Sequence, residues 1–156
     1  MATGTIKWFA QGLHDLGNKI HDLDADDFRL GIVTTATVPA VNTAAPHWGG
    51  TGTTNFATNQ VGTGGTSYTG PIVLTSEAWA LNANGANMDW SDTPMQLPQD
   101  ASGFTNGAYG IVYNNTDANK RALCYIEISS AGTASLVTGA ININLNASGA
   151  LSLNQA

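Results

Sequence analysis

The sequence contains few charged residues and very few basic ones. Asp, Glu, Lys and Arg make up 10% of its 156 residues, whereas about 25% is usual in soluble domains. Five of these residues are basic and eleven are acidic, which gives a net charge of −6. Nucleic-acid binding needs several Lys or Arg contacts with phosphates, and an anionic membrane also attracts basic clusters. We therefore expect neither a nucleic acid nor a membrane as a partner.

Cysteine and long apolar runs are also scarce. Cys124 is the only cysteine, so no disulfide bond can form within the chain. Its place in an apolar stretch predicts a buried, inert thiol. No apolar run approaches the roughly 18 residues that a membrane span requires, and no secretory signal is visible. We therefore expect the protein to be made and folded in a reducing cytoplasm.

Thr, Asn, Gly, Ser and Ala take the place of the missing charges. A free monomer usually keeps itself soluble with a charged surface. A surface rich in amides and hydroxyls is more typical of a protein that packs against copies of itself or against neighbours. The length predicts a single domain over residues 1–156, which is large enough to bury a core without disulfides or metals.

The clearest structural signal is residues 108–128, where two apolar strands flank a polar turn at residues 114–120. In the first strand, Tyr109, Ile111 and Tyr113 recur with the period of two that a strand requires. In the second strand, the same alternation places Leu123, Tyr125 and Glu127 on one face, opposite Ala122, Cys124, Ile126 and Ile128. Both faces are largely apolar, so we expect this hairpin to be central in a sheet that is covered on both sides.

A helix is predicted over residues 5–23. Its apolar stripe, spaced by four and three residues, consists of Phe9, Leu13, Leu16, Ile20 and Leu23. Gly12 and Gly17 each weaken a helix by about 1 kcal/mol relative to Ala, so this helix has to pack across the sheet or against a neighbouring subunit. An acidic segment, residues 22–27, then leads into a strand that begins at Phe28.

Residues 36–68 form a long neutral segment that is rich in Thr, Gly, Asn, Ala and Pro. The segment shows no helical period, and a structureless loop of this length is rare inside a domain. Two interpretations remain open. The segment contains short strands that its pattern does not place, or it is an arm that becomes ordered on another subunit.

Residues 70–153 predict the remainder of a β core. The predicted elements are a strand over residues 71–83, a hairpin turn at Asn84-Gly85, a return strand over residues 87–91, a half-buried strand with Ile141, Ile143 and Leu145, a turn at Ser148-Gly149, and a closing strand over residues 150–153. One helix followed by many short strands predicts a mainly β fold. We expect an antiparallel β-sandwich or barrel with one N-terminal amphipathic helix.

One acidic group matches a metal site in part. The order Asp22, Asp24, Asp26 is that of the opening of a calcium loop. Asp27 and Val33, however, stand where such a loop needs Gly and a bidentate Glu. A solvated connection between helix and strand is therefore the preferred interpretation, and calcium is the alternative.

The sequence has no pattern typical of an active site. His14 and His21 lie two helical turns apart, too far to ligate one zinc ion directly, and His47 lies in the long segment. No G-x-S-x-G elbow, Cys-His pair or phosphate-binding glycine loop occurs. We predict that the chain is not an enzyme and uses no metal or cofactor, and a small hydrolase is the weakest alternative.

The aromatic residues favour an interface. Trp48 follows His47 in a glycine-rich stretch and is the best candidate for an exposed anchor, because loop aromatics often anchor subunit contacts. In the alternative interpretation, Trp48, Trp79 and Trp90 form a stacking platform for sugars. The candidate interface residues, taken from the first helix and the long segment, are Phe9, Leu13, Val41, His47, Trp48 and Phe56.

Five stretches, HDLDADDFRLGIVTT, GTGGTSYTG, AYGIVYNNT, RALCYIEI and ININLNASGALSL, follow one another along the chain. Their order resembles a group of small virion proteins of tailed bacteriophages, which open with a short helix and continue through comparable strands and turns. One departure is the double glycine, which here precedes Tyr68 and does not follow it. The resemblance implies a structural protein of the particle, in the manner of head decoration (cement) proteins.

The resemblance also implies a location and partners. Decoration proteins bind outside the shell, often as trimers, and clamp neighbouring coat subunits. We therefore expect this chain on the outer capsid surface, with the major capsid protein and two further copies of itself as partners. The alternative within the same class is a tail, neck or fibre-associated protein that contacts host glycans through Trp48 and its neighbours.

Overall fold

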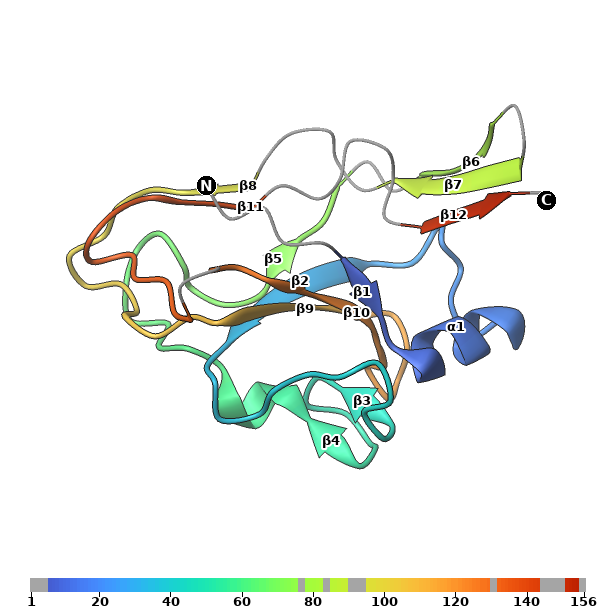
Figure 1. The fold of residues 1–156 in the computed structure, drawn as a ribbon, viewed down its shortest axis with the longest axis horizontal. Coiled ribbons are helices and arrows are strands. Elements are labelled where there is room, and N and C mark those ends of the chain that lie inside the picture. The colour runs from blue at the N-terminus through green and yellow to red at the C-terminus, as the bar shows by residue number, and fades with distance from the viewer. Residues whose placement is uncertain are drawn as a thin grey trace.

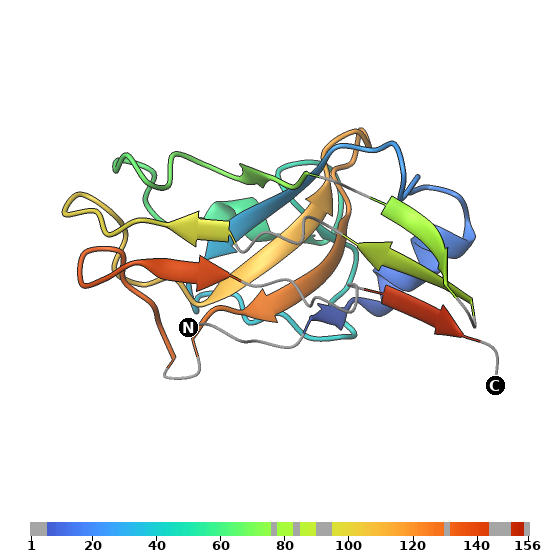
Figure 2. The ribbon, with the colours of Figure 1, turned by 90° about the horizontal axis from the view of Figure 1, so that it is seen from above.

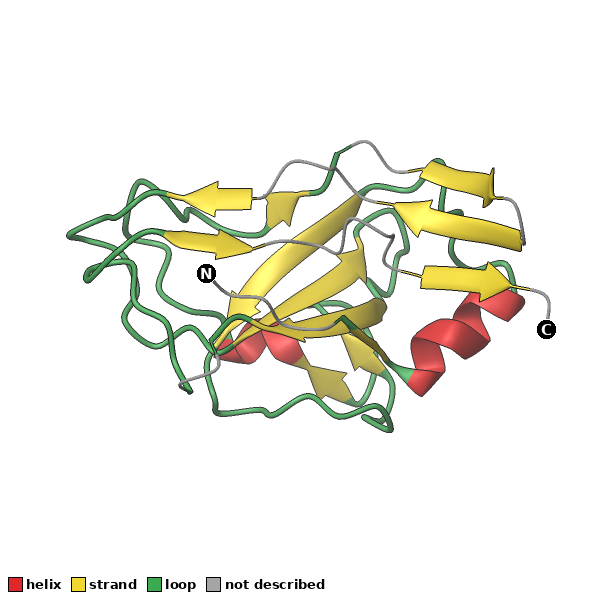
Figure 3. Cartoon of the chain, turned by 45° about the horizontal axis from the view of Figure 1, so that its top comes forward, coloured by secondary structure: helices red, strands yellow, loops and turns green. Residues whose placement is uncertain are grey.

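The computed structural model describes residues 6–75, 78–82, 85–89, 95–129, 132–143 and 151–154. This part of the chain is mainly β, with one α-helix and a short 3₁₀ helix (Figures 1 and 3). The elements are β1 (Lys7–Trp8), α1 (Ala10–Gly17), β2 (Phe28–Val33), β3 (Pro46–His47), β4 (Thr54–Asn55), the 3₁₀ helix η1 (Phe56–Asn59), β5 (Ile72–Val73), β6 (Ala78–Asn82), β7 (Gly85–Asp89), β8 (Met95–Leu97), β9 (Tyr109–Asn114), β10 (Ala122–Glu127), β11 (Ile141–Ile143) and β12 (Leu151–Asn154).

A five-stranded antiparallel sheet forms the middle of the molecule. Its strand order is β1-β10-β9-β2-β5, so the predicted hairpin β9–β10 is confirmed and lies at the centre. β2 pairs along its whole length with β9, from Phe28 opposite Asn114 to Val33 opposite Tyr109. The two edge strands of this sheet are β1 and β5, which have two residues each.

The predicted alternation along β10 is wrong for Ala122 and Leu123. Ala122 pairs with Tyr113 and Cys124 with the next residue, Val112, so Leu123 is an extra residue in the strand. Such a β-bulge shifts the two-residue period. As a result, Leu123 contacts the same core as Cys124, whereas Tyr125 contacts the same core as Ala122.

An upper layer covers one face of this sheet (Figure 1). It consists of the pair β8–β11 and the three-stranded sheet β12-β7-β6. In this layer β7 pairs antiparallel with β12, and β8 pairs antiparallel with β11. Seen from above, the strands of this layer cross those of the central sheet obliquely (Figure 2). Two packed antiparallel layers agree with the predicted sandwich class.

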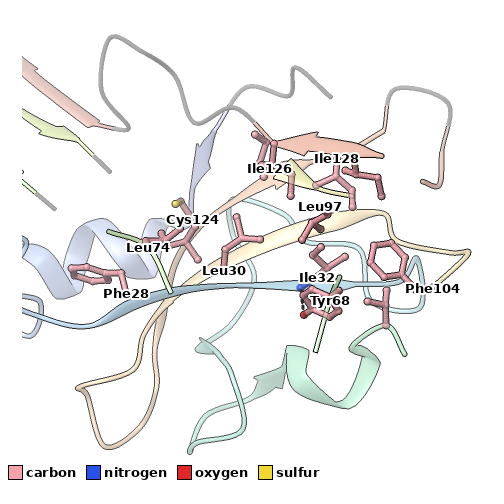
Figure 4. Close-up of a cluster of buried hydrophobic side chains, with 14 of the residues drawn as sticks. Phe28, Leu30, Ile32, Tyr68, Leu74, Leu97, Phe104, Cys124, Ile126 and Ile128 are labelled. Atoms are coloured by element: carbon pink, nitrogen blue, oxygen red, sulfur yellow. Dashed lines mark hydrogen bonds between the residues drawn. The ribbon is translucent and has the colours of Figure 1, made fainter. Parts of the chain in front are cut away.

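The upper core lies between the central sheet and this layer (Figure 4). Tyr68 is buried in this core. Its hydroxyl oxygen accepts a hydrogen bond from the backbone N–H of Ile32 at 2.9 Å, and its ring lies edge-on to the ring of Phe104, with centroids 5.6 Å apart. The predicted burial of Cys124 is confirmed. The buried members are Leu23, Phe28, Leu30, Ile32, Val61, Tyr68, Leu74, Leu97, Phe104, Val112, Leu123, Cys124, Ile126, Ile128, Leu136, Ile141 and Ile143.

The long segment 36–68 covers the opposite face and is not a free arm. It contains β3, β4 and η1, so the first of the two interpretations is confirmed. Asn55 caps η1 by accepting a hydrogen bond from the N–H of Ala57 at 3.0 Å. Between this segment and the central sheet lies the lower core, which consists of Phe9, Val33, Trp48, Phe56, Ile111, Tyr113, Ala122 and Tyr125.

The helix is shorter than predicted. α1 begins at Ala10, because Lys7 and Trp8 pair with β10 as β1. It ends at Gly17, since Asn18 is the C-cap and Lys19 has a φ of 57°, a left-handed conformation that a right-handed helix cannot continue. Ile20, His21 and Leu23 were expected on the helix, but they lie beyond its end at Gly17.

Some boundaries in the β core also differ from the prediction. The predicted strand over residues 71–83 is divided into β5 and β6, which belong to different sheets. The predicted hairpin is present as β6–β7, with Asn82 opposite Gly85, so the return strand begins at Gly85 rather than at residue 87. The closing strand is β12. The expectations for Trp90, Leu145 and Ser148-Gly149 lie outside the described residues.

Candidate functional site

An apolar groove of about 790 Å³ lies between α1 and β6. In Figure 1, α1 lies below β6, β7 and β12 at one end of the molecule. The apolar lining comes from Leu13 and Leu16 of α1, from Leu23 after the helix, and from Trp79 of β6. The polar residues that line the groove are Lys19, His21 and Asp22.

Gly12 determines how closely α1, which forms one wall of this groove, packs on the sheet. A Cβ atom at Gly12 would lie 2.5 Å from the carbonyl oxygen of Leu123, so the helix backbone lies directly on β10. The next residue, Leu13, is consequently turned away from the sheet, and its side chain is 45% exposed. Gly12, which weakens the isolated helix, therefore serves its close packing on the sheet.

The acidic segment reaches the outer edge of β6. The backbone N–H of Trp79 donates to Oδ1 of Asp24 at 3.4 Å. Asp24 is in turn held by a hydrogen bond from its own N–H to Asp22 Oδ1 at 3.1 Å, and the N–H of Asp22 donates to Asp26 Oδ2 at 2.8 Å. The three aspartates that match the opening of a calcium loop thus bind backbone donors.

A polar junction joins this segment to the turn between β9 and β10. The buried side chain of Asn114 donates from Nδ2 to Asp26 Oδ2 at 2.6 Å and to Nδ1 of His21 at 3.1 Å. Its Oδ1 accepts from the N–H groups of Thr116 and Asp117 at 2.8 and 3.0 Å. Because these two N–H groups donate to it, this atom of Asn114 is the amide oxygen and the other is the amide nitrogen Nδ2. Nδ2 donates to Nδ1 of His21, so Nδ1 is the acceptor and Nε2 of His21 carries the proton.

His21 is buried and neutral in this junction. Burial lowers the pKa of His21 below its usual value, against the opposing influence of Asp15, Asp117 and Asp26. Within the described residues, Nε2 of His21 and Oδ2 of Asp15 have no hydrogen-bond partner. Asp15 is anchored through Oδ1, which accepts from Gln11 at 2.8 Å.

The junction has the geometry of a structural tie. His21 Nδ1 is occupied by an amide, not by a hydroxyl or thiol that it could activate. Over the described ranges, no three His, Cys, Asp or Glu side chains are grouped so that they could hold a metal ion. What the arrangement does is fasten residues 21–27 to residues 114–117.

Four of the six predicted interface residues are buried, namely Phe9, His47, Trp48 and Phe56. The expectation that Trp48 is exposed is therefore wrong. Trp48 lies face to face with Tyr113, with centroids 5.3 Å apart and planes 6° apart, and the absence of a Cβ at Gly31 leaves room for its ring. Phe9 and Phe56 also belong to the lower core. His47 is 4% exposed, and Ala45 O lies 3.2 Å from its Nδ1.

The other two predicted residues, Leu13 and Val41, are exposed. The N–H of Ala10, at the start of α1, donates to the carbonyl oxygen of Val41 at 2.8 Å. Val41 is 52% exposed and Val38, in the same turn, is 62% exposed. The structure thus places Val41 against the start of α1, about one helical turn before Leu13.

Leu81, an exposed apolar residue of β6, was missed as a site residue by the sequence analysis, which named Trp79 only as part of the alternative sugar platform. Trp79 is half-buried against the upper core, and Leu81 is 92% exposed on the same strand. Ala78–Asn82 has no charged residue, and this absence in a strand that lies at a sheet edge is the signal that could have identified it.

No protein-family model, curated protein or solved structure matches this chain. In the described part of the chain, no helix is both long and apolar enough to cross a membrane.

Proposed function

We propose that this chain is a structural virion protein that decorates the outside of a bacteriophage head and bridges coat subunits. The resemblance of five ordered stretches to small virion proteins supports this proposal, and a β-sandwich with a helix at one end is compatible with it. The partners are the major capsid protein and further copies of the chain.

The observation that carries the proposal is an uncharged surface with exposed apolar residues. No Asp, Glu, Lys or Arg occurs between Arg29 and Glu77, and this stretch supplies Val33, Trp48 and Phe56 to the lower core. Within it, Val38 and Val41 are exposed, and the carbonyl oxygen of Val41 accepts a hydrogen bond from the N–H of Ala10 at the start of α1. A surface without charges carries a small desolvation cost when it is buried against another protein.

Decoration is a mechanical function that this surface suits. A protein that binds the assembled shell, and not the free coat subunit, stabilises the shell by mass action. The net charge of −6 suits the outside of a DNA-filled shell better than its interior.

The tail or fibre alternative has lost one of its supports. It relied on an exposed Trp48 for glycan contact, and Trp48 is buried against Tyr113. Decoration is therefore the favoured function.

Copy number in purified virions tests the location. Quantitative mass spectrometry against the major coat protein should give a ratio near one chain per coat subunit. A handful of copies per particle would assign the chain to the tail or neck. Absence from the particle would rule out a virion function.

Point substitutions test the surface. Deletion of residues 36–68 would remove Trp48 and Phe56 from the lower core and unfold the protein, so it cannot test the surface. Val41→Lys should instead weaken binding to undecorated particles at least about tenfold, the equivalent of about 1.4 kcal/mol. Val73→Lys is the matched control, because Val73 is equally exposed but lies on β5. Equal binding by both variants would exclude this surface.

A further inference from the structure

β6 is the longest open strand edge in the described structure. It ends the sheet β12-β7-β6, and no described strand pairs with its outer side. The edges of the central sheet, β1 and β5, are only two residues long, which is one way in which proteins protect sheet edges. β6 has five residues, Ala78–Asn82, and none of them is charged.

The outward backbone groups of β6 are those of residues 79 and 81. The N–H of Trp79 points away from β7, because it donates to Asp24. Backbone groups alternate along a strand, so the N–H and C=O of Leu81 face the same open edge. The side chains of Trp79 and Leu81 share the face of the strand that borders the groove, since Trp79 lines it.

We propose that β6 pairs antiparallel with β6 of a second copy of this chain, about a two-fold axis at Ala80. In this register Trp79 lies opposite Leu81 of the second copy, and Leu81 lies opposite its Trp79. Both positions have outward N–H and C=O groups, so each pair forms two backbone hydrogen bonds. The sequence of β6 is thus complementary to itself, and the contact is isologous.

The groove supplies the apolar part of this contact. Residues directly opposite each other on neighbouring strands have Cβ atoms about 4.5–5.5 Å apart, so Leu81 of the second copy would lie beside Trp79, at the groove that Leu13 and Leu16 line. A side chain that is 92% exposed in one copy is thereby covered.

Asp24 competes with this pairing. Its carboxylate accepts from the N–H of Trp79 in the single copy, and the second strand has to replace that hydrogen bond. This competition keeps β6 from pairing indiscriminately and makes the association reversible. The inference concerns the free protein and does not depend on the proposed place in a virion.

A cysteine pair tests the register. In Ala80→Cys the two new thiols lie opposite each other at the axis, at a separation that a disulfide can span. In the matched variant Ala78→Cys they lie about 13 Å apart along the strands, at about 3.4 Å per residue, which is too far for a disulfide. The native Cys124 is fully buried and does not interfere. Mild oxidation should crosslink Ala80→Cys alone, and crosslinking of both variants or of neither would overturn the proposal.

Sedimentation of the wild-type chain provides a second, independent measurement. A monomer–dimer equilibrium is expected, and Leu81→Lys should lower the association constant at least about tenfold, whereas Val73→Lys should leave it unchanged. Asp24→Ala should strengthen dimerisation relative to Asp24→Asn, which retains an acceptor for the N–H of Trp79. A monomer at all concentrations, or a trimer insensitive to Leu81→Lys, would overturn the proposal.

Discussion

At the scale of single residues, Gly31 and Trp48 illustrate how the lower core is fitted together. The Trp48 ring occupies the space where a Cβ of Gly31 would lie, and its other neighbour is the ring of Tyr113. A strand residue without a side chain is thus required in the middle of β2, where a β-branched residue would otherwise be favoured.

Substitution of Gly31 should therefore destabilise the fold. Gly31→Ala forces Trp48 from its position, and overpacking of this kind costs about 1–3 kcal/mol. Urea denaturation should show a lower midpoint with an unchanged slope. Gly64→Ala is the control, because nothing lies within 4 Å of the added methyl group, and its stability should stay within about 0.5 kcal/mol of wild type. Equal stability of both variants would contradict the fitted core.

His21 makes stability depend on pH. Its pKa is lowered in the folded state by burial, so the unfolded chain binds a proton more readily. Stability is therefore fully present above the unfolded pKa of about 6.5, and it decreases as the pH falls below that value. Protonation of Nδ1 would also place an N–H against the amide donor of Asn114.

The test is the urea midpoint measured between pH 8 and pH 5. Wild type should lose stability over this range, and His21→Gln should lose less. Asp27 and Asp100 also have lowered pKa values, from hydrogen bonds with Arg29 and with the N–H of Ser67 respectively. Their contributions are lost only as the pH falls below about 3.8, so they do not affect this range.

At the scale of elements, two glycines of α1 have opposite roles. Gly12 lies against the backbone of Leu123, whereas Gly17 at the helix end has no atom within 4 Å of an added Cβ. Gly12→Ala should separate α1 from β10 and destabilise the protein by about 1–3 kcal/mol. Gly17→Ala should be neutral or stabilising by up to about 1 kcal/mol, the difference in helix propensity. Thermal unfolding followed by circular dichroism distinguishes them, and a stabilising Gly12→Ala would contradict the contact.

At the scale of the whole molecule, the central sheet is the part covered on both faces. The upper core and the lower core meet at β2, β9 and β10, so the interior amides of these strands open only when the whole molecule unfolds. Hydrogen exchange followed by mass spectrometry should find them the slowest, with β5 and the outer edge of β6 faster. Equal protection of β5 and β9 would contradict this order.

Much of the fold was predictable because its signals are local. The period of two in β9 and in β2, and the apolar character of both faces of β10, follow from the sequence and place the hairpin at the centre. The bulge at Leu123 and the late start of α1 were not predicted. Both depend on contacts between distant segments, such as β1 with β10 and α1 with Leu123.

The candidate site depended on tertiary structure even more. Trp48 in a glycine-rich stretch has the sequence of an exposed anchor, yet it is buried because Gly31 and Tyr113 provide a place for its ring. Leu81 has the sequence of an ordinary strand residue, yet it is exposed because β6 lies at the edge of its sheet.

The sequence by itself determined that this is a mainly β protein, low in charge and without a basic patch, because composition and alternation act locally. The tertiary structure alone decided which apolar residues remain on the surface. Burial is a property of neighbours brought together from distant parts of the chain, and no local pattern specifies which neighbours those are.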